Sequence, residues 1–196
     1  MKTILFIDGR NLISKMKYAL YPSKGKNIDF TIYNFKGLFD KVLSKIEVDR
    51  RIFYFGGLII DKRTEKKSIE LIEKQRRLKT SLEKQEFEVI YAGRIRGHKE
   101  NCPKGHNFLS FKEKGVDVRI AVDMVGMAHN KELKLAIIAS SDSDLQPAIT
   151  ELKNNSIERI YLGLEDSPNK GLTYTTNRTI LIRNSELEEF LGKKLI

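Results

Sequence analysis

Cysteine is nearly absent from this chain of 196 residues: Cys102 stands alone, which excludes an internal disulfide. No apolar run approaches the length of a membrane-spanning helix, and the N-terminus leads into a strand pattern without a signal peptide. Internal repeats, low-complexity runs and linkers are missing as well. We therefore expect one cytoplasmic domain over residues 1–196 with no membrane association.

Positive charge is in excess, with a formal net charge of +10 and a pI near 9.6. A hydrophobic content of 40% beside 32% charged residues is typical of a globular chain that can bury a substantial core. The charge favours an anionic partner. In combination with an acidic pocket it fits a nuclease, which attracts a polyanion overall but presents carboxylates to the scissile phosphate.

The most informative stretch is Leu135–Ala139, five consecutive apolar residues that predict a strand buried on both faces of a parallel sheet. Two acids, Asp142 and Asp144, follow it directly, and an apolar helix pattern begins there. Ser141 or Asp142 would cap that helix. The acids therefore lie at the edge of an open α/β sheet where ligands usually bind.

Strand and helix patterns alternate along the chain. The strands are predicted at 3–8, 51–55, 87–92, 135–139, 157–162 and 179–182, and the helices at 11–20, 35–46, 62–84, 115–125, 143–153 and 185–192. This order predicts an α/β fold: a doubly wound, mostly parallel sheet of five to six strands with helices on both faces. Asn11 is expected to cap the first helix, Gly56 and Gly57 to stop the second strand, and residues 178–192 to form a C-terminal extension.

Residues 93–114 interrupt this alternation with a basic insertion, which we expect to form a β-hairpin or a solvated loop. It has only two acids, Glu100 and Glu113, and we predict that its cations hold a nucleic acid backbone: Arg94, Arg96, Lys99, Lys104, Lys112 and Lys114. The basic helix at 62–84 is expected to be a solvated face, and an RNA-facing role is the alternative.

Four acids could meet at one site: Asp8 after the first strand, Asp117 in the first turn of a helix, and Asp142 with Asp144. If the first and fourth strands are neighbours, Asp8 and Asp142 lie side by side at the topological switch point. Two acids so close repel each other unless a cation lies between them. Carboxylate oxygens of this kind suit Mg²⁺ or Mn²⁺.

Each of these acids also has an ordinary structural interpretation. Asp117 and Asp142 could be helix caps, Asp144 could complement a helix dipole, and Asp8 could be a turn residue. Asp123 lies six residues after Asp117, about 600° around a helix and so on a different face. We expect it to approach the pocket edge or to pair with a lysine, not to bind the metal directly.

Three segments, Phe6–Asn11, Lys114–Met124 and Ala139–Pro147, resemble the three signature blocks of the NYN domain, a family of PIN-like, metal-dependent nucleases. The blocks occur in the family's order and lie within residues 3–165. The resemblance implies a strand order of 3-2-1-4-5, an RNA substrate and a metal site. The implied metal ligands and catalytic residues are Asp8, Asp117, Asp142 and Asp144, with Asn11, Ser141, Ser143 and Asp123 supporting the pocket. Serine replaces the family's common glycine at position 141, which fits a cap.

The leading hypothesis is a ribonuclease dependent on Mg²⁺ or Mn²⁺ that acts on single-stranded or loop regions of RNA, with a homodimer left open. The alternative is a non-catalytic RNA-binding or regulatory module on the same fold, although a binder gains nothing from acids that face phosphate. A phosphatase of the haloacid dehalogenase kind would need a second acid two residues after Asp8. Arg10 occupies that position.

Overall fold

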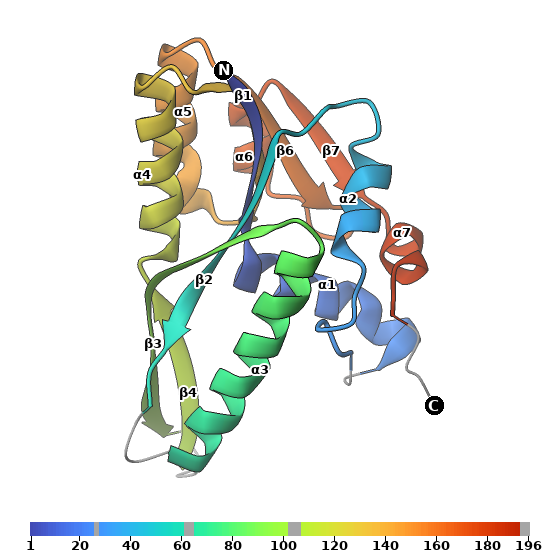
Figure 1. Cartoon of the computed structure of the whole chain (residues 1–196), viewed down its shortest axis with the longest axis vertical. Coiled ribbons are helices and arrows are strands. Elements are labelled where there is room, and N and C mark those ends of the chain that lie inside the picture. Colours follow the sequence, from blue (N-terminus) through green and yellow to red (C-terminus); the bar gives the residue numbers. More distant parts are fainter. Residues whose placement is uncertain (26–27, 61–64, 102–106, 193–196) are drawn as a thin grey trace.

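A computed structural model describes residues 1–25, 28–60, 65–101 and 107–192 of the chain, and Figure 1 shows its arrangement. The described strands form one sheet in the order β4-β3-β2-β1-β5-β6-β7, in which only β4 is antiparallel to its neighbour. The strands are β1 (Lys2–Asp8), β2 (Arg50–Leu58), β3 (Glu88–Asn101), β4 (Asn107–Lys114), β5 (Leu133–Ala139), β6 (Glu158–Leu164) and β7 (Arg178–Ile182).

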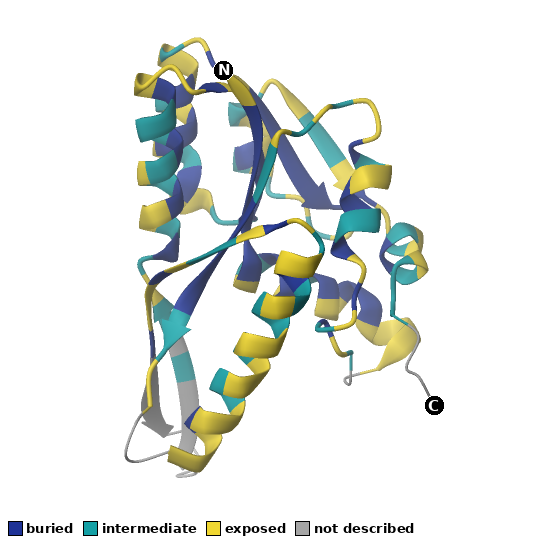
Figure 2. Ribbon diagram, in the orientation of Figure 1, coloured by how far each residue is buried: buried dark blue, intermediate teal, exposed yellow. Residues whose placement is uncertain are grey.

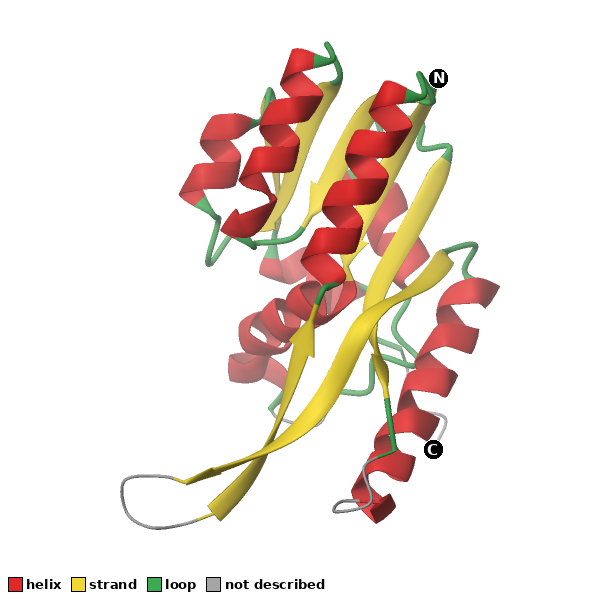
Figure 3. Cartoon of the chain, turned by 90° about the vertical axis from the view of Figure 1, so that its left-hand side faces the viewer, coloured by secondary structure: helices red, strands yellow, loops and turns green. Residues whose placement is uncertain are grey.

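Helices cover both faces of the sheet, as Figures 1 and 3 show. One face packs against α1 (Gly9–Lys24), α2 (Phe35–Val42), α3 (Glu65–Lys84) and α7 (Asn184–Glu189). The other packs against α4 (Val116–His129), the 3₁₀ turn η1 (Ser143–Leu145), α5 (Gln146–Asn154) and α6 (Lys170–Thr175). None of the described helices is both long enough and apolar enough to cross a membrane.

The doubly wound α/β architecture is confirmed, and so is the strand order. The predicted strands in chain order correspond to β1, β2, β3, β5, β6 and β7, so the order 3-2-1-4-5 is the observed β3-β2-β1-β5-β6. The sheet has one strand more than expected because the basic insertion supplies β4. Arg94 pairs with Lys114 and Asn101 with Asn107, so the insertion is a β-hairpin. Figure 3 shows this hairpin projecting beyond the sheet.

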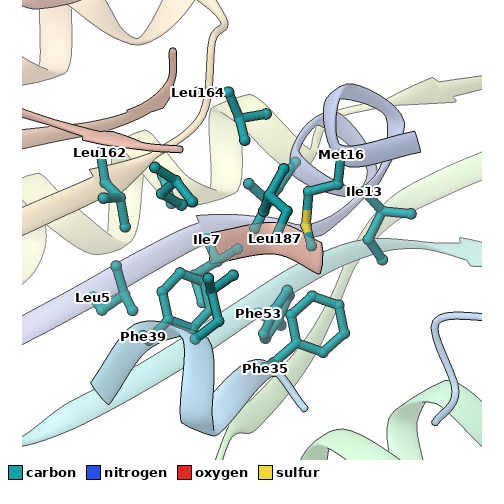
Figure 4. Close-up of a cluster of buried hydrophobic side chains, with 14 of the residues drawn as sticks. Leu5, Ile7, Ile13, Met16, Phe35, Phe39, Phe53, Leu162, Leu164 and Leu187 are labelled. Atoms are coloured by element: carbon teal, nitrogen blue, oxygen red, sulfur yellow. The ribbon is translucent and has the colours of Figure 1, made fainter. Parts of the chain in front are cut away.

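The central strands are almost completely buried, as the dark ribbon in Figure 2 shows. On the α1 side the core is rich in aromatic rings. Phe53 has its ring centroid 5.3 Å from that of Phe35 and 5.1 Å from that of Phe87, both edge-to-face. Figure 4 shows Phe35, Phe39 and Phe53 beneath Ile13 of α1. Each fully buried side chain of this size contributes about 1.5–3 kcal/mol to the free energy of unfolding. The packing on this face therefore stabilises the positions of β1 and β2.

Several predicted boundaries were wrong: the helix predicted at 35–46 ends at Val42, for example, and the strand predicted at 87–92 continues to Asn101. Strand β2 does not stop at the glycine pair but continues to Leu58, with a register shift between Phe55 and Gly57 where it pairs with β3. Pairing to the long β3 strand satisfies its backbone groups, which outweighs the low strand preference of glycine. Helix α1 continues to Lys24, because Pro22 lies in the last turn and interrupts little of the hydrogen bonding.

Candidate functional site

Asp8 is the last residue of β1 and the N-cap of α1. Its Oδ1 accepts a hydrogen bond from the backbone N–H of Asn11 at 3.0 Å, and its Oδ2 accepts one from the Ser140 hydroxyl at 3.4 Å. The side chain is only 7% exposed. The expectation that Asn11 caps this helix was therefore wrong: Asp8 caps it, because a cap must precede the N–H group that it receives.

Asn11 instead holds the loop that follows β5. Its Oδ1 accepts hydrogen bonds from both the backbone N–H and the hydroxyl of Ser141, each at 2.9 Å. From the other side, the amide of Asn169 donates to the Ser141 carbonyl at 2.8 Å, and Tyr161 receives the Asn169 backbone N–H at 3.0 Å. Asn169 was not anticipated, because it caps α6, a helix too short to show a periodic pattern.

Asp142 caps the turn η1, as one of the two predicted capping residues. Its Oδ1 accepts the backbone N–H of Asp144 at 3.0 Å, and its own N–H donates to the Ser140 hydroxyl at 3.1 Å. Ser140 therefore bridges Asp142 to Asp8, which brings the ends of β1 and β5 together as expected. Ser143 and Asp144 are exposed and lie on the outer side of this turn.

Asp117 lies half-buried in the first turn of α4, which begins after Gly115 in the left-handed conformation (φ 89°). A fifth acid stands close by. Glu113, at the end of the hairpin strand β4, accepts the backbone N–H of Gly56 at 2.7 Å, at the irregularity in β2. From the sequence, Glu113 was expected only to be one of the two acids in the basic insertion. Its place just before the Asp117 block was the signal that could have identified it.

The electrostatics tie these acids together. Burial, helped by the negative charges of Glu113 and Asp142, raises the pKa of Asp8 to about 6, although the hydrogen bonds from Asn11 and Ser140 act in the opposite direction. Burial also raises the pKa of Glu113, an effect that Asp117 reinforces and that Gly56 and Arg10 oppose. Negative charge thus accumulates at one edge of the sheet, where a cation would relieve it.

Asp123 lies apart from these interactions. Its Oδ2 accepts the hydroxyl of buried Tyr54 at 3.0 Å, and its Oδ1 accepts Nε of Arg119 at 2.7 Å. The expected basic partner exists, but it is an arginine of the same helix and not a lysine. Both carboxylate oxygens are occupied by the protein, so these contacts support a structural role for Asp123.

The donor chemistry suits a hard divalent cation, since Asp8, Glu113, Asp117 and Asp142 offer only carboxylate oxygens. Among the described residues, however, no three acidic, histidine or cysteine side chains stand close enough to form a ligand cluster. The acids therefore lie at one edge of the sheet, but their side chains do not converge on a single position. A bound ion would draw them together against the hydrogen bonds that hold Asp8 and Asp142.

The hairpin leaves the sheet at this same edge. The Arg10 guanidinium, directly after the Asp8 turn, donates to the Phe111 carbonyl at 2.6 Å and so ties α1 to β4. Arg94 and Lys114 are exposed partners at the hairpin base. All six predicted nucleic-acid contacts remain predictions. Arg96, Lys99 and Lys112 are described in their backbone alone, and Lys104 lies outside the described residues.

Comparison with known proteins supports the resemblance to the NYN family and the observed fold. The chain matches the NYN domain model over residues 2–183. A search of curated proteins gives no match. Among solved structures, the chain is similar in fold to VPA0982, a protein of unknown function from Vibrio parahaemolyticus, with a TM-score of 0.55 and 16% identity over 92% of this chain and 93% of that one. With the match covering nearly its whole length, the chain belongs to the NYN domain family, a family of PIN-like nucleases.

Proposed function

We propose that this protein is a metal-dependent ribonuclease that hydrolyses phosphodiester bonds in single-stranded or loop regions of RNA. One observation carries the proposal. A buried acid at the end of a central strand, Asp8, is surrounded by the further negative charges of Glu113 and Asp142 in a chain of a nuclease family. Uncompensated carboxylates are costly in a folded protein, and their maintenance at a ligand-binding edge indicates that a cation is their partner.

Asp8, Asp117, Asp142 and Asp144 are the proposed ligands of Mg²⁺ or Mn²⁺, and Glu113 adds to their charge. When bound, such an ion polarises a phosphate and lowers the pKa of the attacking water. The chain itself supplies the geometry. Ser140 holds Asp8 and Asp142 together, and the Asn11 side chain fixes the loop that carries Asp142.

The direct test is the cleavage of one structured and one unstructured RNA in the presence of Mn²⁺, Mg²⁺ or EDTA. We expect cleavage with either metal, faster on the unstructured RNA, and none in EDTA. Equal cleavage in EDTA and in metal would contradict the proposed mechanism. Protein purified with Asp142→Asn serves as the control against a contaminating nuclease.

Glu113 can be tested separately from the aspartates. Glu113→Gln keeps an oxygen to accept the Gly56 N–H but removes the charge, so the β2 irregularity should persist. If its charge helps to hold the metal, the variant needs more Mg²⁺ to reach half its maximal rate. An unchanged metal dependence would mean that Glu113 only stabilises the sheet, through its hydrogen bond from the Gly56 N–H.

A non-catalytic RNA-binding module on the same fold is the second candidate. It is favoured by the separation of the acids, since no three of the described ligand side chains form a cluster. A binder should hold intact RNA with or without metal, and Asp142→Asn should then bind RNA more tightly, because it removes a charge that repels phosphate. A nuclease should instead lose cleavage in this variant.

A further inference from the structure

A groove between α1 and α3 begins beside the acidic edge. Its volume is about 320 Å³, which is at the lower end of the range for small-ligand sites. Its lining comes from both helices, from the segment 28–31 and from β2, β3 and β4, and it includes Arg10, Ser14, Lys17, Phe30, Phe55, Lys74 and Glu113. Arg10 and Glu113 belong to the surroundings of the acids, so groove and acids are continuous.

The inner wall of the groove is apolar, and the two aromatic rings beneath it, Phe30 and Phe55, are almost fully buried. The Phe55 ring presses against Gly9, the residue after Asp8, so closely that a Cβ atom at Gly9 would lie 2.2 Å from it. Any larger residue at position 9 would push the ring out of place. The apolar wall therefore reaches the backbone next to the innermost acid.

The rim of the groove is cationic. The Lys17 ammonium lies 5.9 Å from the centre of the Phe30 ring, and Lys74 faces it from α3. Partial burial and the like charge of Lys74 lower the pKa of Lys17. In the part of the chain that is described, neither ammonium has a carboxylate within 4 Å. The pKa of exposed Asp29 is lowered mainly by its hydrogen bonds from Thr31 and less by the charge of Lys74. An anion between the two lysines would relieve their repulsion.

A second hollow continues the groove along α3 and shares Thr31 with it. Its volume is about 400 Å³, and its lining contains three cations and no acid: Thr31, Arg76, Arg77, Thr80, Ser81 and Lys84. Arg76 is paired with Glu73, which leaves Arg77 and Lys84 as the free charges there among the described residues. Positive charge thus runs from Lys17 and Lys74 to Arg77 and Lys84 along the second half of α3.

We propose that the α1–α3 groove binds one nucleotide of a single-stranded RNA beside the bond that is cut, with its base against the apolar wall and its phosphate between Lys17 and Lys74. The strand then continues along α3 towards Arg77 and Lys84. The inference rests on the proposed ribonuclease function and adds the path of its substrate. A nucleotide combines the flat apolar surface and the anionic group that the wall and the rim each require.

The rim is tested by the affinity of a fluorescent oligouridylate, measured by anisotropy in EDTA so that nothing is cleaved. Lys17→Ala combined with Lys74→Ala should weaken binding on the order of tenfold, as the loss of charge-assisted contacts predicts. The dependence of log affinity on log salt should become shallower by about 0.7 for each lost contact. The matched control combines Lys134→Ala with Lys153→Ala, which removes the same charge from exposed positions outside both hollows.

The wall is tested without a change of charge. Ser14 is exposed at the groove on α1, so Ser14→Trp should fold normally and occupy the space of the base. We expect it to weaken oligouridylate binding and to leave the salt dependence unchanged. Wild-type protein should prefer oligouridylate to an abasic oligomer of equal length and charge, and the variant should lose this preference. Equal binding of both oligomers by the wild type would overturn the nucleotide site.

These outcomes are separable from those of the cleavage assay. If the lysine pair behaves like its control in binding while wild-type protein cuts RNA, the groove proposal fails and the nuclease stands. If the groove variants weaken binding but no metal supports cleavage, the substrate path stands and the nuclease fails. Thermal unfolding of each variant establishes that the loss of binding is not a loss of fold.

Discussion

The acidic edge and the α1–α3 groove adjoin each other but are built in opposite ways. At the edge, Asp8 and Asp142 are held by backbone N–H groups and by Ser140, at the ends of two almost fully buried strands. In the groove, Lys17 and Lys74 project from two helices, and among the described residues neither ammonium has a carboxylate within 4 Å. Acids held by hydrogen bonds suit the positioning of a reaction, and cations on long side chains suit a strand of variable shape.

This difference predicts two kinds of response to mutation. Removing one acid should change the reaction greatly and the binding of RNA little, because the network positions atoms at one point. Removing one cation should change binding moderately and leave the reaction of bound RNA intact, because each cation contributes a small share. The four predictions that follow test this contrast, beginning with the largest effect.

Asp142→Asn should reduce RNA cleavage roughly a thousandfold or more, because a bound metal supplies several kcal/mol of charge stabilisation. The asparagine oxygen still accepts the Asp144 N–H, so the turn η1 should persist. Single-turnover cleavage with saturating protein measures the effect on bound RNA. If Asp142→Asn changed only the affinity for RNA and not the rate of cleavage, Asp142 would be a binding residue, and the expected difference between acids and cations would be wrong.

Asp117→Ala should lower the cleavage rate on the order of a hundredfold, whereas Asp123→Ala should lower it only a few-fold. Asp123→Ala should instead reduce the free energy of unfolding by about 1–3 kcal/mol, because buried Tyr54 loses its hydrogen-bond acceptor. Initial rates and urea unfolding of both variants give the comparison. Equal losses of rate would show that α4 presents both acids to the substrate.

Much of this fold could be predicted because its signals are local. Leu135–Ala139 could only be a buried strand, and the acids after it are placed by the rule that ligands bind at the carboxyl ends of parallel strands. The hairpin could be recognised as an insertion because glycine and charge interrupt the strand–helix alternation. Its pairing depends on backbone hydrogen bonds between β3 and β4, which composition does not specify.

The remaining parts of the site depend on contacts between residues far apart in the sequence. Asn169 reaches the Ser141 carbonyl, and Glu113 reaches the Gly56 N–H, although no spacing in the sequence connects these pairs. The groove likewise requires α1 and α3 to lie beside each other with Phe55 between them. The basic helix at 62–84 was expected to be a solvated face, with an RNA-facing role as the alternative, because a helical pattern does not show which of its faces borders a hollow.

Asp8→Asn should stabilise the metal-free protein at pH 7 and not at pH 4. Burial raises the pKa of Asp8 from 3.8 to about 6, so between these values the folded state binds more protons than the unfolded state. The free energy of unfolding therefore falls as the pH rises through this window, and stays low above it. Removing the charge should raise the free energy of unfolding by about 1–3 kcal/mol at pH 7.

Urea unfolding in EDTA at both pH values measures this difference, and Asp144→Asn is the control because Asp144 is exposed. Mg²⁺ should stabilise wild-type protein and have less effect on Asp8→Asn, since the metal compensates the same charge. A variant that is less stable at pH 7 would mean that capping of α1 outweighs the repulsion.

The smallest effect should come from the hairpin, which is also rich in cations. Arg94, Arg96, Lys99 and Lys104, each replaced by Gln, should weaken oligouridylate binding a few-fold, because a single charged contact to a phosphate contributes little on its own. The slope of log affinity against log salt should fall by about 0.7 for each phosphate contact removed.

Combining the four changes with Lys17→Ala and Lys74→Ala should give additive losses of binding free energy if the two surfaces bind different parts of one strand. If the hairpin variant matches wild type in affinity and slope, the groove alone holds the strand. If the hairpin variant loses more affinity than the groove variant, the RNA strand passes over the hairpin, and the hairpin is the main binding surface beside the acids.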